Sequence, residues 1–193
     1  MISAIILAAG ESTRMGEPKP LVKFGQHSFL EAILQNFRNA GIEDVLIVLG
    51  HESERIIEEL KLPVDNYTIN KNYQLGQFSS VQQGVKNLNS KCTGAFLALV
   101  DQPQISTKVL INICKVFEEN ANKIVIPTFR GKRGHPPVLP KWLFHEILTA
   151  NPTQKTSEII RNHPHKVCEL KIDDESILWN MNTKQDLEKI SSS

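Results

Sequence analysis

Short apolar runs alternate along this sequence with segments whose apolar residues recur every three or four positions. The first pattern is typical of strands buried on both faces of a parallel sheet, and the second is typical of helices. Strands joined through helices form right-handed crossovers, so the alternation predicts a Rossmann-like three-layer α/β/α fold with a mostly parallel sheet. The predicted strands are 2–8, 44–49, 67–70, 95–100 and 124–127, and the predicted helices are 28–41, 53–60, 79–88 and 106–119.

The turn-rich segment 128–140 interrupts this alternation. It contains two glycines and three prolines, which predict a loop or short hairpin over the sheet that acts as a lid. Because the chain shows neither an internal repeat nor a linker, we expect residues 1–193 to form a single domain. The later predicted elements are helices 142–150 and 157–161, strands 166–171 and 177–180, and a C-terminal helix that begins at Asn182 or Thr183.

Composition narrows the class of protein. Hydrophobic residues make up 40% and charged residues 22%, which predicts a folded chain. The formal charge of +1 offers no broad field for nucleic acid or anionic lipid, so we expect neither as a partner. The apolar runs are shorter than the roughly 20 residues of a membrane span, and no signal sequence stands out, so a cytoplasmic location is expected. Cys92, Cys114 and Cys168 form no C-x-x-C pair and are interpreted as reduced core thiols.

The sequence LAAGESTRMGEPKPL, residues 7–21, follows the first predicted strand and has the residue types of an anion site. Ala8, Ala9 and Gly10 let the backbone approach a ligand closely, so that N–H groups can point at phosphate oxygens. Arg14 and Lys19 add positive charge, which stabilises a triphosphate under attack at its α-phosphorus. The alternative is a surface loop with solvated basic side chains. The string matches neither the Walker nor the dinucleotide-binding pattern.

This loop resembles the L-A-A-G-x-S-x-R-M-G-x-x-K signature of the MobA-like nucleotidyltransferase superfamily. Three further segments resemble its molybdenum cofactor cytidylyltransferase branch: GQFSSVQQG at 76–84, LVDQPQIS at 99–106 and GKRGHPPVL at 131–139. The resemblance implies a fold like that of nucleotide-diphospho-sugar transferases. It also favours CTP over GTP, since the guanylyltransferase branch usually has L-A-G-G where this chain has Ala9. The candidate nucleotide-binding residues are Ala8, Ala9, Gly10, Ser12, Arg14, Lys19, Ser79 and Ser80. The candidate catalytic residues are Arg14, Lys19 and Asp101.

Asp101 directly follows a predicted buried strand, and its charge and position suit a Mg²⁺ ligand beside the triphosphate. The alternative is a turn cap before Pro103. The family commonly supplies a second carboxylate from a D-x-D-T segment, whereas residues 180–183 here read N-M-N-T. An amide oxygen coordinates Mg²⁺ without contributing charge, so Asn180 is the second metal candidate.

Two further pairs of residues are candidates for ligand contacts. Ser79, with Gln82, forms a predicted capping box, and Ser79 and Ser80 would open a helix whose N-terminus favours an anion. The alternative for both serines is helix capping alone. Arg133 and His135 lie in the predicted lid, where they would meet the phosphate of the acceptor, and the alternative for His135 is an ordinary turn residue.

The resemblance implies a Mg²⁺-dependent transfer of CMP from CTP to molybdenum cofactor (molybdopterin), with release of pyrophosphate. The product would be the cytosine dinucleotide form of the cofactor, so a molybdenum hydroxylase is the implied client. Other reactions on the same fold remain alternatives: guanylyl transfer to the same cofactor, cytidylyl transfer to methylerythritol phosphate and sugar-phosphate nucleotidylyl transfer. A non-catalytic carrier of molybdenum cofactor is the alternative from a different class.

Overall fold

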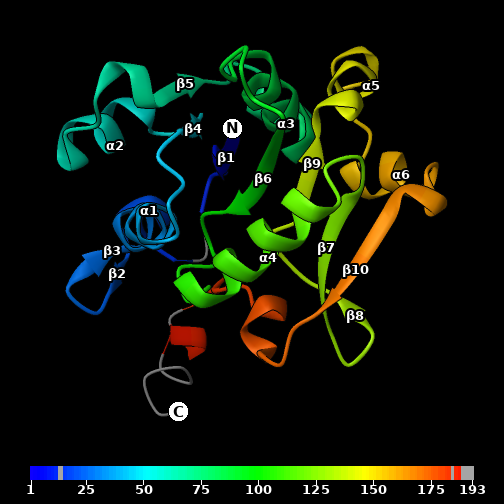
Figure 1. Ribbon diagram of the computed structural model, residues 1–193. Coiled ribbons are helices and arrows are strands. Elements are labelled where there is room, and N and C mark those ends of the chain that lie inside the picture. Colours follow the sequence, from blue (N-terminus) through cyan, green and yellow to red (C-terminus); the bar gives the residue numbers. More distant parts are fainter. Residues whose placement is uncertain (13–14, 184, 188–193) are drawn as a thin grey trace.

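The computed structural model describes residues 1–12, 15–183 and 185–187 of the chain. Its elements are drawn in Figure 1. No helix in these ranges is both long and apolar enough to cross a bilayer. The strands are β1 (Ile2–Ala8), β2 (Lys23–Phe24), β3 (His27–Ser28), β4 (Val45–Leu49), β5 (Tyr67–Ile69), β6 (Gly94–Leu99), β7 (Ile124–Phe129), β8 (Lys132–Arg133), β9 (Val138–Pro140) and β10 (Val167–Lys171). The α-helices are α1 (Phe29–Asn39), α2 (Ser53–Leu60), α3 (Gln77–Lys86), α4 (Thr107–Glu119), α5 (Phe144–Thr149) and α6 (Thr156–Arg161).

The central sheet has the order β10-β7-β9-β6-β1-β4-β5, with β8 paired to β7. Strand β1 runs parallel to β4 and β6, and β5 and β10 run parallel to β4 and β7. Only β8 and β9 pair antiparallel with their neighbours in this sheet. The predicted three-layer fold with a mostly parallel sheet is therefore confirmed. That residues 1–193 form a single domain stays a prediction.

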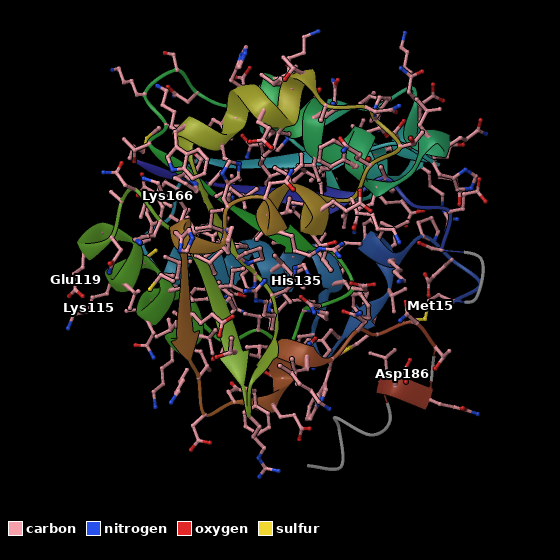
Figure 2. All side chains as sticks on the ribbon, turned by 90° about the vertical axis from the view of Figure 1, so that its right-hand side faces the viewer. Met15, Lys115, Glu119, His135, Lys166 and Asp186 are labelled. Carbon is pink, nitrogen blue, oxygen red and sulfur yellow. The ribbon has the colours of Figure 1, made fainter. Side chains whose placement is uncertain are left out.

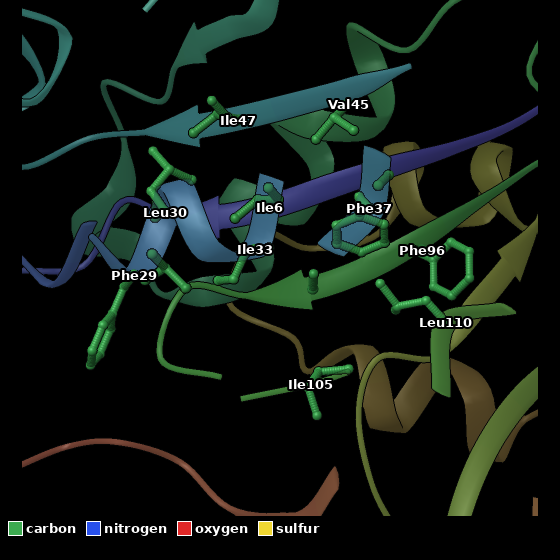
Figure 3. Close-up of a cluster of buried hydrophobic side chains, with 14 of the residues drawn as sticks. Ile6, Phe29, Leu30, Ile33, Phe37, Val45, Ile47, Phe96, Ile105 and Leu110 are labelled. Atoms are coloured by element: carbon green, nitrogen blue, oxygen red, sulfur yellow. The ribbon is translucent and has the colours of Figure 1, made fainter. Parts of the chain in front are cut away.

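Alternate side chains of the central strands point into two separate cores. In β1, Ala4, Ile6 and Ala8 belong to the core beneath α1, α2 and α4, whereas Ile5 and Leu7 belong to the core beneath α3, α5 and α6. Because both faces of the strand are covered, its sequence is apolar apart from the buried Ser3 and does not alternate. Figure 3 shows the first core, where side chains of α1 pack against those of the central strands.

Helix α1 begins where the sequence predicts. The Ser28 hydroxyl accepts a hydrogen bond from the Glu31 backbone N–H, and the Glu31 carboxylate accepts one from the Ser28 N–H, which completes the capping box. The hydrogen bond to the Ser28 backbone contributes most to lowering the pKa of Glu31 below its usual 4.5, and the hydrogen bond to the Ser28 side chain lowers it further. Gly41, with φ at +80°, follows the helix end. Local chemistry alone therefore sets both ends of α1.

The predicted second capping box is wrong. Helix α3 begins at Gln77, two residues before the predicted start, with Gly76 as its N-cap. Gly76 has φ at +110°, which a side chain would strain, so the chain turns into the helix there. Ser79 consequently lies within the first turn, and its hydroxyl is 2.7 Å from the carbonyl oxygen of Gly76.

The strand predicted at 177–180 is also wrong, because these backbone groups bond to other parts of the chain. Residues Glu175–Leu178 form a 3-10 turn. The Gln104 side chain donates to the carbonyls of Ser176 and Trp179, and the His135 N–H donates to the carbonyl of Ile177. A sheet ladder would need the same carbonyl oxygens, so these side-chain and loop contacts replace it.

The predicted lid at 128–140 is only partly a hairpin. Residues 128–133 form the short hairpin of β7 and β8, but β9 lies inside the sheet between β6 and β7. Val138 and Leu139 are fully buried there. The interpretation of residues 138–140 as a cover over the sheet is therefore wrong, because their backbone completes the sheet itself.

Candidate active site

The site forms where the direction of chain progression reverses across the sheet. From β1 the chain passes through α1 to β4 on one side, and it returns through α3 to β6 on the other side. Ligands on open α/β sheets bind outside the carboxyl ends of the strands at such a point. Here those ends carry the loop that follows Ala8 and the turn that begins at Asp101.

The loop after β1 is held in shape by its own backbone and by Ser12. Ser12 adopts φ of +52°, and its hydroxyl accepts a 3.0 Å hydrogen bond from the Lys19 backbone N–H. The Ser12 carbonyl accepts another from the N–H of Met15. Ser12 therefore organises the loop that carries Lys19. Arg14, the other predicted phosphate-binding cation, lies outside the described residues.

Close packing behind the loop sets the position of Ala9. The His51 N–H donates to the Ala9 carbonyl at 3.2 Å. A Cβ added at Gly50 would lie 2.8 Å from the Ala9 Cβ and 2.9 Å from the Tyr73 Cβ, closer than atoms can pack. The small residues at positions 9 and 50 thus let the loop after β1 lie directly against the segment after β4.

Lys19 joins three distant parts of the chain. Its Nζ lies 2.8 Å from the Asp101 carboxylate Oδ2 and 2.8 Å from the Asn182 amide Oδ1. The side chains of Lys19 and Asp101 are only 15% and 18% exposed, so water screens their attraction weakly. Figure 2 shows the segment of Asp186 on the same side of the molecule as Met15, in agreement with the contact between Lys19 and Asn182.

The predicted metal candidate Asn180 lies apart from this cluster. It is exposed, and its amide Oδ1 accepts a 2.8 Å hydrogen bond from the Gln102 side chain. Asn182 instead reaches the cluster, because the Met181 N–H donates to the Asp101 carbonyl and turns the chain at that point. The structure thus favours Asn182 over Asn180 as the amide beside Asp101.

A cavity of about 490 Å³ opens over the carboxyl ends of β1 and β6. Six predicted site residues line it, together with others that include Glu11, Tyr73, Gln74 and Gln77. The predicted residues that line it are Ala9, Gly10, Ser12, Lys19, Ser80 and Asp101. The predicted residues Ala8 and Ser79 are buried and are not part of its lining.

Asn70 explains the placement of the two serines. It is buried at the end of β5, and its amide Nδ2 donates to the Ser79 hydroxyl at 2.8 Å and to the Ser80 hydroxyl at 3.0 Å. The Ser79 hydroxyl is also 3.1 Å from the Asn72 carbonyl oxygen. These bonds tie the first turn of α3 to the end of β5, and the contact of Ser79 with the nucleotide stays a prediction.

A second cavity of about 560 Å³ adjoins the first, since Gly76, Gln77 and Leu99 line both. Its inner wall is apolar and includes Phe78, Ile126 and Pro137. The predicted acceptor-binding residues Arg133 and His135 line it, together with the segment 153–157, Ile160 and Arg161. A ligand in either cavity would therefore lie beside a ligand in the other.

Arg133 and His135 differ in how free they are to bind. Arg133 is half exposed and forms an ion pair with Glu169, at 2.9 Å. His135 is largely buried, and its Nδ1 has no hydrogen-bond partner among the described residues. Burial lowers the pKa of His135 below 6.5, although a backbone hydrogen bond at Leu97 and the charge of Asp101 oppose the shift. A neutral imidazole with one unpaired nitrogen faces the second cavity.

The site offers oxygen ligands for a magnesium ion, though few of them are charged. Within residues 1–12, 15–183 and 185–187, no three His, Cys, Asp or Glu side chains lie close enough together to hold a metal ion. The Asp101 Oδ1 is buried and lacks a hydrogen-bond partner in the same ranges. Mg²⁺ is commonly held by one or two carboxylates together with substrate phosphates. Asp101 and the Asn182 amide fit that pattern.

The structure adds residues that local sequence patterns could not identify. Tyr73, Gln74 and Gln77 face the first cavity because they surround the start of α3, which the sequence placed two residues too late. Lys155 and Arg161 line the second cavity from α6, an element with no motif of its own.

Comparison with known proteins agrees with this geometry. Residues 4–167 match the MobA-like NTP transferase domain family. The bifunctional protein GlmU of Acetivibrio thermocellus is 30% identical over 129 residues, which cover 66% of this chain and 28% of that protein. A probable molybdenum cofactor guanylyltransferase of Bacillus cytotoxicus is 28% identical over 135 residues, covering 68% of this chain and 64% of that one. This chain thus spans less than two thirds of the length of either relative.

Solved structures share the fold over the full length of the chain. The crystal structure of Rv0371c from Mycobacterium tuberculosis H37Rv has a TM-score of 0.83 at 24% identity and covers 100% of this chain and 99% of that one. Rv0371c has also been solved in complex with manganese, with a TM-score of 0.80. The family match over residues 4–167 and the site at the ends of β1 and β6 lead to one conclusion: this chain belongs to the MobA-like NTP transferase domain family.

Proposed function

We propose that this chain transfers CMP from CTP to molybdenum cofactor, with Mg²⁺ bound, and releases pyrophosphate. One observation carries the proposal: Lys19 and Asp101 meet at 2.8 Å in the wall of a cavity that adjoins a second, separate cavity. A nucleotidyltransferase needs such a pair of neighbouring sites, one for the nucleotide and one for the acceptor. The motifs GQFSSVQQG and GKRGHPPVL support the choice of acceptor by their resemblance to the cytidylyltransferase branch.

In this reaction a phosphate oxygen of the acceptor forms a bond to the α-phosphorus of the nucleotide. The bond from that phosphorus to the oxygen bridging to the β-phosphate breaks, and pyrophosphate leaves with the electron pair. A phosphate monoester is largely ionised near neutral pH, so the attacking oxygen needs no general base. Catalysis then depends on position and on neutralisation of charge.

The side chains around the first cavity match that requirement. Lys19, on a loop fixed by Ser12, brings a positive charge to the phosphates. Backbone N–H groups beside Ala9 and Gly10 can approach the nucleotide because no large side chain intervenes. A magnesium ion held by Asp101 and Asn182 would supply Lewis-acid stabilisation of the phosphate oxygens. The manganese complex of Rv0371c supports a divalent ion on this fold.

The identity of the nucleotide base is proposed from similarity to two kinds of molybdenum cofactor nucleotidyltransferase. Ala9, packed against Gly50, favours cytidine through the resemblance to the cytidylyltransferase branch. The similarity to a probable molybdenum cofactor guanylyltransferase favours guanylyl transfer as the second candidate. Competition among CTP, GTP, ATP and UTP for the protein distinguishes the two, and we expect CTP to bind most tightly.

Pyrophosphate release in the presence of CTP, Mg²⁺ and molybdenum cofactor tests catalysis. We expect Lys19→Ala and Asp101→Ala each to reduce it by at least about 100-fold, as removal of a group that stabilises transition-state charge does. Lys23→Ala, at an exposed position on β2, is the matched control and should keep full activity. Activity that persists in both site variants would refute the roles of Lys19 and Asp101. Nucleotide or cofactor binding without any pyrophosphate release would instead indicate the carrier.

A further inference from the structure

The Lys19 ammonium group lies where a cation fits between two oxygens. It is 2.8 Å from Asp101 Oδ2 and 2.8 Å from Asn182 Oδ1, which come from segments 82 and 163 positions away in the sequence. Carboxylate and amide oxygens are also the ligands that Mg²⁺ takes in proteins. The contact therefore uses the same two side chains that fit a magnesium ion.

The segments that carry the two oxygens are held together by contacts other than those of Lys19. The Met181 N–H donates to the Asp101 carbonyl at 2.8 Å, so the two segments are joined through their backbones. The N–H groups of Asn182 and Thr183 both donate to Asp186 Oδ2, at 3.1 and 2.9 Å. The segments that carry Asp101 and Asn182 are thus brought together by contacts that do not involve Lys19.

Lys19 and a divalent ion would repel each other strongly at this position. The side chains of Lys19 and Asp101 are 15% and 18% exposed, so little water lies between the charges to screen them. A metal ion that approaches Asp101 therefore gains one carboxylate but meets an ammonium group a few ångströms away. The triphosphate of a bound nucleotide would change this balance, because its oxygens offer Lys19 another negative partner.

We propose that Lys19 is the resident cation of Asp101, and that a divalent metal binds there only together with a nucleoside triphosphate. Asn182 is the positioning residue that holds the ammonium over Asp101 until the phosphates draw it away. This inference rests on the proposed nucleotide site. Lys19 also neutralises Asp101 while no ligand is bound.

Binding of Mn²⁺ alone, measured on the full chain by electron paramagnetic resonance, tests the inference without any catalysis. We expect weak binding by the unmodified protein. Lys19→Met should bind at least about tenfold more tightly, which corresponds to about 1.4 kcal/mol. Lys19→Gln serves as a second variant in case Lys19→Met does not fold, and circular dichroism checks both. The matched control Lys23→Met removes the same charge at an exposed position and should not change the affinity.

Two further measurements of Mn²⁺ affinity, one on a double variant and one with CTP added, decide how a change at Lys19 is interpreted. Adding Asp101→Asn to Lys19→Met should abolish the gain, and a gain that survives would overturn the inference because the metal would lie elsewhere. Equal Mn²⁺ affinity of the unmodified protein and both Lys19 variants would also overturn it. With CTP added, the unmodified protein should bind Mn²⁺ at least about tenfold more tightly than without it. Failure to bind CTP contradicts the proposed function instead, while the nucleotide-free comparison still decides the role of Lys19.

Discussion

The ion pair of Lys19 and Asp101 shows how much a site can depend on single side chains. Asp101 begins the turn after a buried strand, and Lys19 follows a loop that Ser12 holds in shape. Each residue contributes one charge in a place where water screens it weakly. Loss of either partner would leave the other charge partly buried and unpaired, which costs more than the pair itself contributes.

Gly50 is a residue whose lack of a side chain supports the nucleotide cavity. In Gly50→Ala the new Cβ would meet Ala9 at 2.8 Å and Tyr73 at 2.9 Å, so the loop after β1 must shift. Overpacking of this kind costs about 1–3 kcal/mol, and we expect CTP to bind at least about tenfold more weakly. Isothermal titration with CTP measures the effect. In the control Gly94→Ala the new Cβ would meet the Phe117 ring, at the end of β6 away from the cavity, so the affinity for CTP should stay nearly unchanged.

His135 makes the stability of the protein depend on pH. Its pKa is lowered mainly by burial, so below pH 6.5 the unfolded chain takes up a proton that the folded chain excludes. The folded state therefore loses stability as the pH falls below 6.5, and above pH 6.5 the burial of His135 does not reduce stability in this way. We expect the free energy of unfolding to fall less between about pH 7 and pH 5.5 in His135→Gln than in the unmodified protein.

Urea denaturation at both pH values measures that difference. His145→Gln, which removes an exposed histidine on α5, is the control and should leave the dependence on pH unchanged. If the free energy of unfolding of His135→Gln fell between the two pH values as much as that of the unmodified protein, the burial of this imidazole would have no effect on folding.

At the scale of elements, local signals set the ends of some helices, and tertiary contacts set the ends of others. Ser28 and Glu31 cap α1 through bonds made within four residues. Helix α3 instead begins at Gly76, and Asn70 on the neighbouring strand holds its first turn. The nucleotide cavity depends on α3, so the element that most shapes the site is the one with the weaker local signal.

The cap of α1 gives a direct test of local stabilisation. Ser28→Ala removes the hydroxyl that accepts from the Glu31 N–H, and we expect a loss of about 1 kcal/mol in unfolding free energy. Thermal and urea denaturation measure it. Ser53→Ala is the matched control, since Ser53 opens α2 but its hydroxyl does not cap that helix. The free energy of unfolding should change by no more than about 0.5 kcal/mol.

Helix α6 supplies the cationic side of the second cavity. If an anionic acceptor binds there, Lys155→Ala and Arg161→Ala should each raise the KM for the acceptor about tenfold, because hydrogen bonds to charged groups contribute about 1.5–3 kcal/mol. The affinity for CTP should not change. Steady-state kinetics with Lys108→Ala on α4 as control measures the effect, and an unchanged KM in both variants would place the acceptor elsewhere.

At the scale of the whole molecule, the sheet brings together what the sequence separates. Strand β1 lies between β6 and β4, so the loop after Ala8 and the turn at Asp101 meet over neighbouring strand ends. The C-terminal segment then returns to the same place and contributes Asn182. A ligand in the first cavity would touch the first two regions, and Lys19 connects it to the third, so the ligand should stabilise the fold as a unit.

Thermal denaturation measures this coupling. With Mg²⁺ and CTP at about 100 times its Kd, we expect Tm to rise by about 5 to 10 °C, from a stabilisation of about 2.7 kcal/mol in a chain of this size. Asp101→Ala should lose the part of the shift that requires Mg²⁺. The same rise with and without Mg²⁺ in the unmodified protein would contradict metal binding with the nucleotide.

The sequence alone predicted the layers, the parallel sheet, the cap of α1 and the family. The layers, the sheet and the cap follow from periodicity and from bonds between near neighbours, which a linear sequence records directly, whereas the family follows from the resemblance of the motifs. It also predicted that Lys19 and Asp101 serve one site, because both follow strands whose carboxyl ends share an edge.

Tertiary structure decided the rest. Contacts between residues far apart in the sequence decide that Asn182 and not Asn180 reaches Lys19 and that α3 begins at Gln77. They also decide that residues 138–140 lie inside the sheet and that His135 is buried. The apolar run at 177–180 fitted a strand equally well, yet its carbonyls bond to Gln104 and His135. Local patterns state which backbone shapes a segment favours, but only the assembled fold determines which distant groups compete for its hydrogen bonds.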